Sequence, residues 1–256
     1  AQRIEQKFSR YRDDNIIYKI NNANGAAVEV DEETARMIDF SNQLTDMSEG
    51  LFDITSGVLR RAWKFDGSDR IPAQSQIRPL LDQLGWSQVQ RKAGAVQMPA
   101  AMELDFGGIG KEYAVDRALQ LARQITDSPL LVNFGGDIAS WCGGAEPWQV
   151  GLEGLGEGKL AGSFALANGA LATSGDSRRY LLHEGVRYSH VLNPHTGWPV
   201  ADAPHSVTVF AAQCTLAGML ATLALLRGAD AEKFLLQQGV QYWCLWGDRQ
   251  GATVTG

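Results

Sequence analysis

The chain has 256 residues, of which 45% are hydrophobic and 28 are glycine, and its formal net charge is −6. This length suits one large domain or two closely joined lobes, with enough apolar residues for a sizeable core. The acidic balance, without a stripe of basic residues interleaved with aromatics, argues against nucleic acid as the main partner. No apolar run approaches the roughly 20 residues that a membrane span needs.

Apolar periodicity predicts helices and strands interspersed along the chain. We expect helices over residues 31–48, 71–84, 112–125, 215–227 and 229–238. We expect strands just before Asp105 and over residues 129–133, 148–151, 162–166, 205–211 and 240–245. No repeat, low-complexity run or linker divides the chain. The pattern therefore predicts an α+β fold with mixed sheets flanked by helices.

The glycine-rich run Asp105–Lys111 (DFGGIGK) carries the clearest motif. Glycines allow a ligand to approach the backbone, and the helix start that follows has N–H groups suited to a phosphate. A Walker A loop is excluded because Asp105 stands at its first glycine and Glu112 follows the lysine. A dinucleotide fingerprint fails because Tyr113 replaces its third glycine. Taken alone, the run fits either a nucleotide site or a tight strand-to-helix turn.

Three further segments carry candidate chemistry. Residues 172–180 place small hydroxyl residues and two arginines around a glycine, which suits either an anion site or a polar turn. In residues 188–199, His190 is either a general base or a structural histidine. Gly218 and Thr222 share one face of the predicted late helix. The Thr222 hydroxyl either enters a site or bonds back to the preceding turn.

These segments occur together in the order found in a known family. The chain resembles the FAD:protein FMN transferases, the ApbE family, from Phe8 to about Gly228. The runs that carry the resemblance are Ser56–Leu59, Asp105–Lys111, Val132–Asp137, Ala172–Asp176 and His190–Gly197. Each run alone is weak, and the five in order are specific.

The resemblance implies an enzyme that transfers FMN from FAD to a Ser or Thr hydroxyl of a target protein, with Mg²⁺, and releases AMP. It also implies a two-lobed arrangement with the flavin site between the lobes. The target would be a flavin-accepting subunit of a membrane redox complex, and the location would be periplasmic or associated with the cell envelope. Because the family's N-terminal strand has no counterpart before Ala1, we expect a single domain over residues 1–256 that lacks this strand.

The resemblance also assigns roles to individual residues. His190 would be the catalytic base that activates the acceptor hydroxyl. The flavin-contacting residues would be Tyr11, Asp53, Ile54, Thr55, Asp105, Lys111, Thr173, Ser174 and Leu192. The magnesium site would be formed by the carbonyl of Gly108, by Thr222 and by Ala221.

One departure from the family pattern affects the metal site. The late helix of the family reads Ala-Asp-Ala-Leu-Ala-Thr, whereas this chain has Gly218 in place of the aspartate. Magnesium prefers charged oxygen ligands, so this loss removes the counter-charge of the site. Four other aspartates are candidates to replace it: Asp105, Asp137, Asp176 and Asp202.

The departure leaves three functions open. The chain is a flavin transferase, a flavin-binding protein without transfer activity, or a hydrolase that splits FAD into FMN and AMP. Gly218 favours the second and third of these functions. His190 and Thr222 favour the first, because a protein that only holds FAD has no use for a base. If the late helix binds the metal, the substitution Gly218→Asp is expected to raise magnesium affinity.

Overall fold

The computed structural model describes residues 1–256 except 67, 93, 155–157, 177–178, 249–250 and 256. The chain divides into two compact units. The first, here called the sheet unit, comprises Ala1, Ile109–Arg178 and Val200–Gly256. The second, here called the N-terminal unit, comprises Gln2–Gly108 and Arg179–Pro199.

The sheet unit is built on a six-stranded sheet with the order β13-β12-β11-β8-β5-β4. The strands are β4 (Leu130–Phe134), β5 (Asp137–Trp141), β8 (Gly169–Gly175), β11 (Ser206–Ala211), β12 (Gln241–Asp248) and β13 (Gly251–Thr255). Neighbouring strands pair antiparallel throughout this order. The central pair joins β8 and β11, with Ser174 opposite Val207 and Thr173 opposite Thr208.

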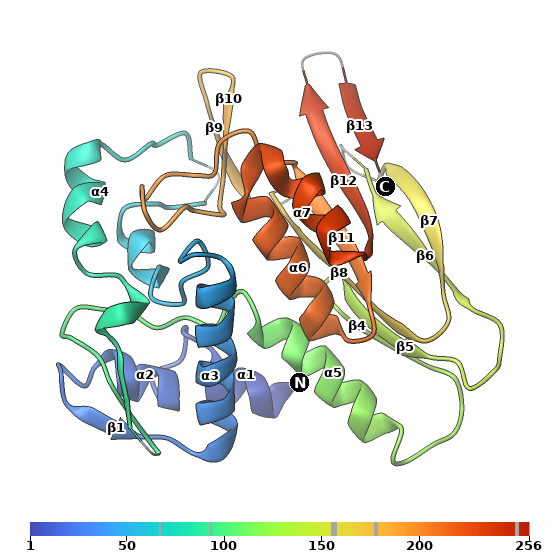
Figure 1. Ribbon diagram of the computed structural model, residues 1–256, viewed down its shortest axis with the longest axis horizontal. Helices are drawn as coiled ribbons and strands as arrows, with labels where there is room; N and C mark the ends of the chain where they lie inside the picture. The colour runs from blue at the N-terminus through green and yellow to red at the C-terminus, as the bar shows by residue number, and fades with distance from the viewer. Residues whose placement is uncertain (67, 93, 155–157, 177–178, 249–250, 256) are drawn as a thin grey trace. The chain divides into compact units, whose positions relative to one another are not determined.

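Helices cover one face of this sheet. Helix α6 (Cys214–Leu226) packs on β8 and β11, and α5 (Gly110–Ala122) packs on β4 and β5 beside α6 (Figure 1). The α6 sequence CTLAGMLATLALL is apolar almost all round, as expected for a helix enclosed by a sheet and two neighbours. A 3₁₀ turn (Gly228–Asp230) leads into α7 (Ala231–Gln238), which also packs on α6.

A hairpin supplies the core on the opposite face of the sheet. Strands β6 (Trp148–Glu153) and β7 (Leu160–Leu166) pair antiparallel. Their apolar side chains cluster with those of the central sheet: Ile138, Val150, Leu152, Leu166 and Leu171 are buried, and Phe164 and Phe210 pack against them. Side chains alternate along a strand, so Leu171 and Thr173 of β8 lie on this face and Ala172 and Ser174 lie on the helical face.

The N-terminal unit is mainly helical. Its helices are α1 (Gln2–Phe8), α2 (Ile16–Asn21), α3 (Glu32–Met47) and α4 (Gln74–Leu81), with 3₁₀ turns at Gly57–Arg61 and Trp86–Gln88. A small antiparallel sheet has the order β1-β3-β2, formed by Ala27–Glu29, Ala95–Gln97 and Gln90–Lys92. Strands β9 (Tyr180–His183) and β10 (Val186–Ser189) form a separate hairpin.

The predicted α+β class is confirmed, and the predicted helices and strands have counterparts except for the strand just before Asp105, where Glu103 forms only an isolated bridge with Ser56. Two further readings need correction. The polar-turn reading of residues 172–175 is wrong, because they form the end of the central strand β8. Their Thr, Ser and Gly residues resemble turn chemistry, and pairing with β11 overrides that local preference. Strand β5 was not predicted, because the run of glycines before it was read as a stop.

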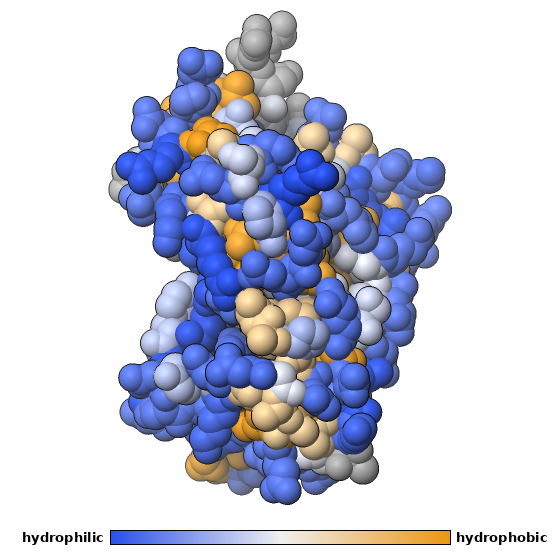
Figure 2. Space-filling model, turned by 90° about the vertical axis from the view of Figure 1, so that its left-hand side faces the viewer, coloured by the Kyte–Doolittle hydropathy of each residue, from blue (hydrophilic) through white to orange (hydrophobic). Residues whose placement is uncertain are grey.

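Hydrophilic residues predominate on the face shown in Figure 2, and hydrophobic residues are interspersed in its middle part. Among the described residues, no helix combines the length and apolar character needed to cross a membrane.

Candidate functional site

The residues assigned by the resemblance are distributed over both units. The N-terminal unit carries Tyr11, Asp53, Ile54, Thr55, Asp105, Gly108, His190 and Leu192. The sheet unit carries Lys111, Thr173, Ser174, Ala221 and Thr222.

Within the N-terminal unit, two arginines join Tyr11 to Asp105. The Asp105 carboxylate forms ion pairs with Arg10 at 3.1 Å and Arg60 at 3.0 Å, and it accepts the Gly107 N–H at 2.9 Å. Arg60 also donates to the Tyr11 hydroxyl at 3.0 Å, although the Tyr11 side chain is 77% exposed. Asp105 is therefore held in place and neutralised before any ligand binds. Sequence reasoning missed both arginines, which stand 95 and 45 positions away.

The segment Asp53–Thr55 holds the loop beneath Asp105. Asp53 accepts the N–H and the hydroxyl of Thr55, both at 2.7 Å, and the N–H of Trp86 at 2.9 Å. Ile54 and Thr55 are buried, and the Ile54 carbonyl accepts the Asp105 N–H at 2.8 Å. This stretch positions the Asp105 backbone, while its own side chains are engaged with the protein.

Gly108 ends the same loop with its backbone against an aromatic ring. A Cβ at this position would lie 3.2 Å from the Phe52 ring, so a side chain would press on that ring. Leu192 has a packing role nearby in the fold: it packs against the buried clusters around Val58, Leu59 and Trp63. Packing therefore explains a small residue at position 108 and an apolar residue at position 192.

His190 follows strand β10 and has a defined ring orientation. Its Nδ1 lies 3.0 Å from the carbonyl oxygen of Arg179, and its ring meets Phe65 edge-on, with 6.3 Å between the centroids. A carbonyl can only accept, so Nδ1 carries the proton and the lone pair of the neutral ring is on Nε2. A general base needs this tautomer when Nε2 is the atom that takes the proton.

In the sheet unit, Lys111 pairs with a buried carboxylate. Its Nζ lies 2.5 Å from Asp137 Oδ2, and Asp137 is 1% exposed. Asp137 also accepts the Thr173 N–H at 3.3 Å. Burial raises the pKa of Asp137 in spite of the attraction of Lys111. The lysine predicted to contact a flavin is thus engaged within the protein.

The two hydroxyl residues of β8 point in opposite directions. Ser174 Oγ lies 2.6 Å from Thr222 Oγ1 on α6, on the helical face of the sheet. Thr173 bonds to Thr208 at 2.8 Å on the other face. Ser174 and Thr222 therefore share one site, and Thr173 cannot present its side chain to the same place. Ala221 is fully buried, and because its side chain is a methyl group, only its carbonyl oxygen is a candidate metal contact.

A glutamate occupies the space beside Gly218. A Cβ at position 218 would lie 2.5 Å from Glu112 Cγ and 2.9 Å from Glu112 Oε1. Glu112 is only 7% exposed, and its Oε2 has no hydrogen-bond partner among the described residues. Burial, reinforced by the nearby Asp137 charge, raises the pKa of Glu112 to about 8. In the sequence, Glu112 served only to exclude a Walker A loop, and its proximity to Gly218 was missed.

The four aspartates considered as substitutes have other roles or positions. Asp105 lies in the N-terminal unit with its arginines, and Asp137 pairs with Lys111. Asp176 lies 3.2 Å from His205 Nδ1, and Asp202 is exposed in a turn with φ of 50°. Among the described residues, no group of three or more His, Cys, Asp or Glu side chains is arranged to hold a metal ion. Any metal bound here would rely on hydroxyl and carbonyl oxygens with few carboxylates.

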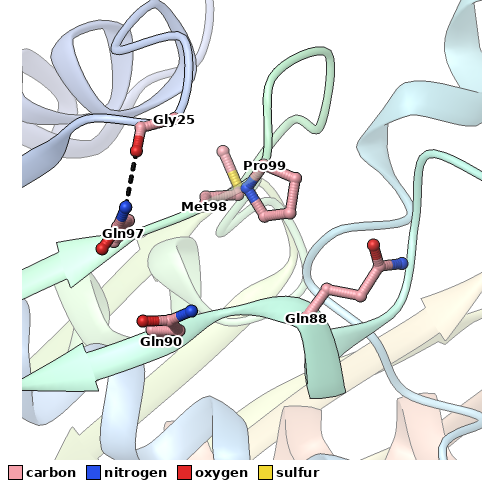
Figure 3. Close-up of a pocket in the computed structure, with 6 residues that line it drawn as sticks. All are labelled: Gly25, Gln88, Gln90, Gln97, Met98 and Pro99. Atoms are coloured by element: carbon pink, nitrogen blue, oxygen red, sulfur yellow. Dashed lines mark hydrogen bonds between the residues drawn. The ribbon is translucent and has the colours of Figure 1, made fainter.

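A small pocket of about 120 Å³ lies elsewhere, in the N-terminal unit (Figure 3). It is lined by Gly25, Gln88, Gln90, Gln97, Met98 and Pro99, and Gln97 donates to the Gly25 carbonyl at 2.7 Å. None of the predicted site residues lines it. Its volume is below the roughly 300 Å³ at which small-molecule sites begin, so it is too small for FAD.

Comparisons with known proteins support the resemblance read from the sequence. The model of the ApbE family matches residues 1–244. The chain is 29% identical to the FAD:protein FMN transferase of Treponema pallidum, over 100% of this chain and 77% of that protein. It is 26% identical to the Haemophilus influenzae protein of the same name, over 89% of this chain and 70% of that protein.

Solved structures agree with these matches. The crystal structure of the ApbE protein of Thermotoga maritima superposes with a TM-score of 0.88 at 32% identity, covering 99% of this chain and 84% of that one. The Pseudomonas stutzeri flavinyl transferase ApbE, at 24% identity, shares the fold with a TM-score of 0.86. The match covers 99% of this chain and 82% of that one. The resemblance is confirmed by both kinds of comparison.

Proposed function

The chain belongs to the ApbE family, and we propose that it transfers FMN from FAD to a Ser or Thr hydroxyl of a target protein and releases AMP. The names of its relatives support the flavin transfer. The observation that carries the proposal beyond flavin binding is His190, whose Nδ1 is held by the Arg179 carbonyl at 3.0 Å. A histidine oriented in this way is of use to a reaction that removes a proton.

The proposed reaction is a single displacement at phosphorus. The lone pair on His190 Nε2 accepts the proton of the target hydroxyl, and the hydroxyl oxygen bonds to the phosphorus on the FMN side of the pyrophosphate. The bond from that phosphorus to the bridging oxygen breaks, and the oxygen leaves with AMP. The products are a phosphoester-linked FMN and AMP, so the atoms balance.

Magnesium dependence is part of the proposal, and the chemistry of the available donors fits it. Thr222 and Ser174 provide hydroxyl oxygens, and the buried Glu112 Oε2 lacks a hydrogen-bond partner among the described residues. Hard oxygen donors with few carboxylates suit Mg²⁺, which usually completes its shell with water and substrate phosphates. When bound, the ion would neutralise charge on the pyrophosphate.

Arginines support the proposed FAD binding. Arg10 and Arg60 surround Asp105 with more positive than negative charge, which favours an anionic ligand. The charge of Lys111, in the first turn of α5, is engaged by Asp137, so this lysine adds less to the attraction. A flavin-accepting subunit of a membrane redox complex, on the periplasmic side, remains our prediction for the target and its location.

One experiment separates transfer from its alternatives. The protein is incubated with FAD, MgCl₂ and a target domain bearing the acceptor Thr, and a target with that Thr replaced by Ala is the control. Fluorescent target in a denaturing gel, with an equal amount of AMP, supports transfer. AMP without fluorescent target identifies a hydrolase, and bound FAD with neither product identifies a holding protein; either result contradicts the proposal.

A further inference from the structure

The space beside Gly218 shows that positions 112 and 218 are complementary. The two residues are 106 positions apart, on helices α5 and α6 of the same unit. The Glu112 side chain lies where a side chain of residue 218 would begin, with 2.5 Å between its Cγ and an added Cβ. Cβ contacts below 3.0 Å essentially do not occur in proteins. Glycine at 218 is therefore the condition for Glu112 to occupy this place.

Among the described residues, Glu112 takes part in no ion pair. Its Oε2 is buried and has no hydrogen-bond partner among the described residues. The positive charge next to it in sequence, Lys111, lies 2.5 Å from Asp137. A buried ionised carboxylate is costly unless it is paired or coordinates a metal. When Glu112 is ionised, its carboxylate and that of Asp137 therefore lie near one lysine, which already pairs with Asp137.

Glu112 lies beside Gly218, which is one helical turn from the other oxygen donors on this side of the sheet. Gly218 and Thr222 lie on one face of α6, about 6 Å apart along the axis at 1.5 Å per residue. Thr222 Oγ1 lies 2.6 Å from Ser174 Oγ, so two hydroxyls stand one helical turn from the residue that Glu112 covers. A carboxylate at Gly218 and two hydroxyls one helical turn along α6 are hard oxygen donors, which magnesium prefers.

We propose that the Glu112 carboxylate of α5 supplies the charged ligand for the divalent cation that α6 lacks at Gly218. The inference rests on the proposed function, because the cation is the magnesium of the transfer reaction. Glu112 takes the role for which the sequence suggested four aspartates. The three atoms nearest to an added Cβ at Gly218 all belong to Glu112, and none belongs to those aspartates. This role of Glu112 also removes the reason why Gly218 favoured an inactive protein.

The same geometry reverses one expectation from the sequence. Gly218→Asp was expected to raise magnesium affinity, but Glu112 already fills the space that the new side chain needs. The single variant must displace Glu112, so we expect it to bind magnesium no better than the parent. The double variant Glu112→Ala/Gly218→Asp removes the obstacle and places a carboxylate on α6 instead.

The test is a calorimetric titration of MgCl₂ into the FAD-saturated protein. The variants are Glu112→Gln, Gly218→Asp and the double variant, with Glu146→Gln as a control for an exposed carboxylate of the same unit. Glutamine retains the shape of Glu112 without its charge. We expect Glu112→Gln to weaken magnesium binding about tenfold or more, the double variant to recover most of it, and Glu146→Gln to leave it unchanged.

Circular dichroism and thermal unfolding in EDTA establish which variants are folded. If folded Glu112→Gln binds magnesium as tightly as the parent, the proposal is wrong even when flavin transfer requires magnesium. If Glu112→Gln does not fold, the double variant decides. Recovered magnesium affinity in the double variant supports the proposal. A folded double variant that does not recover magnesium affinity contradicts the placement of the metal site at Gly218. If the parent itself binds no magnesium with FAD present, both this inference and the magnesium dependence of the proposed function fail.

Discussion

The carboxylates of the two units have opposite charge environments. In the N-terminal unit, Asp105 and Glu103 are surrounded by Arg10, Arg60 and Arg61, at distances from 2.7 to 3.2 Å. In the sheet unit, Glu112 and Asp137 are more deeply buried, and Lys111 pairs with Asp137. Among the described residues, the two carboxylates therefore meet three paired cations in the N-terminal unit and one in the sheet unit.

This contrast indicates which ligand each unit can accept. The surplus of guanidinium groups around Asp105 favours an anion such as a flavin phosphate. The buried Glu112 beside Gly218, whose Oε2 lacks a hydrogen-bond partner among the described residues, favours a cation or a proton. A substitution in one unit should therefore have effects on stability or ligand binding that the matching substitution in the other unit lacks.

The largest expected effect concerns the base of the N-terminal unit. His190→Gln should lower the rate of flavin transfer about 10²- to 10⁴-fold, because the hydroxyl loses its proton acceptor. Magnesium binding should not change, since His190 belongs to neither carboxylate cluster. The rate is followed by single-turnover fluorescence of the target, with His183→Gln in strand β9 as the control. An equal loss in both variants would deny His190 a specific role.

The second prediction tests the charge contrast through stability. Lys111→Met should lower the free energy of unfolding by about 2 to 3 kcal/mol, because it leaves the buried Asp137 carboxylate without its cation. Arg60→Met should cost less than about 1 kcal/mol, since Asp105 retains Arg10 at 3.1 Å. Urea unfolding in EDTA at pH 7 measures both. Similar values for the two variants would mean that the units do not differ in the way the ion pairs suggest.

The third prediction uses pH. The pKa of Glu112 in the folded protein is about 8, above its ordinary value of 4.5. The folded state therefore holds this proton more tightly, so its stabilising effect is complete below about pH 4.5 and is lost as the pH rises towards 8. In EDTA, we expect unfolding free energy to fall by up to about 1.4 kcal/mol per pH unit in this window.

Glu112→Gln is the control for this pH dependence. Glutamine cannot titrate, so the variant should lose most of the slope between pH 5 and 8 and be at least as stable as the parent at pH 8 in EDTA. A parent protein with no such slope would show that Glu112 is not strained by burial, and the charge contrast between the units would lose its main support.

The smallest effect is expected at the exposed charges of the N-terminal unit. Asp31 caps α3 by accepting the Thr34 N–H at 2.9 Å, and it pairs with Lys7 at 2.5 Å. Lys7 and Thr34 lower the pKa of Asp31 to about 2, so its contribution is present above about pH 4 and is lost as the pH falls towards 2. Asp31→Ala should cost about 1 kcal/mol and Asp31→Asn less, because asparagine still caps the helix.

Thermal unfolding at pH 7 compares the two substitutions at Asp31. If Asp31→Asn were as damaging as Asp31→Ala, the Lys7 charge would matter more than the cap. Exposed ion pairs in this unit would then carry more stability than surface pairs generally do.

Local sequence determined much of the fold and the list of candidate residues. The late helix was predicted over residues 215–227 and is found at Cys214–Leu226, because its apolar residues and flanking signals need no distant partner to be recognised. The glycine loop before α5 and the oriented His190 were likewise identified from composition and order. For these features, the information lies within about 15 consecutive residues.

Tertiary structure decided which of those residues share a site. The strand β8 looked like a turn because its Thr, Ser and Gly residues favour turns, and only pairing with β5 and β11 made it a strand. That pairing sends Ser174 to Thr222 and turns Thr173 to the other face. Two adjacent candidates were thereby separated by a property of the sheet, its side-chain alternation.

Glu112 is the clearest case of what the sequence alone does not contain. In the sequence alone, Gly218 stands where the family has an aspartate, and Glu112 is an ordinary acidic residue in the first turn of a helix. The packing of α5 against α6 brings that glutamate to the glycine. Contacts between residues 106 positions apart depend on how two helices are seated on one sheet, and no local pattern specifies this.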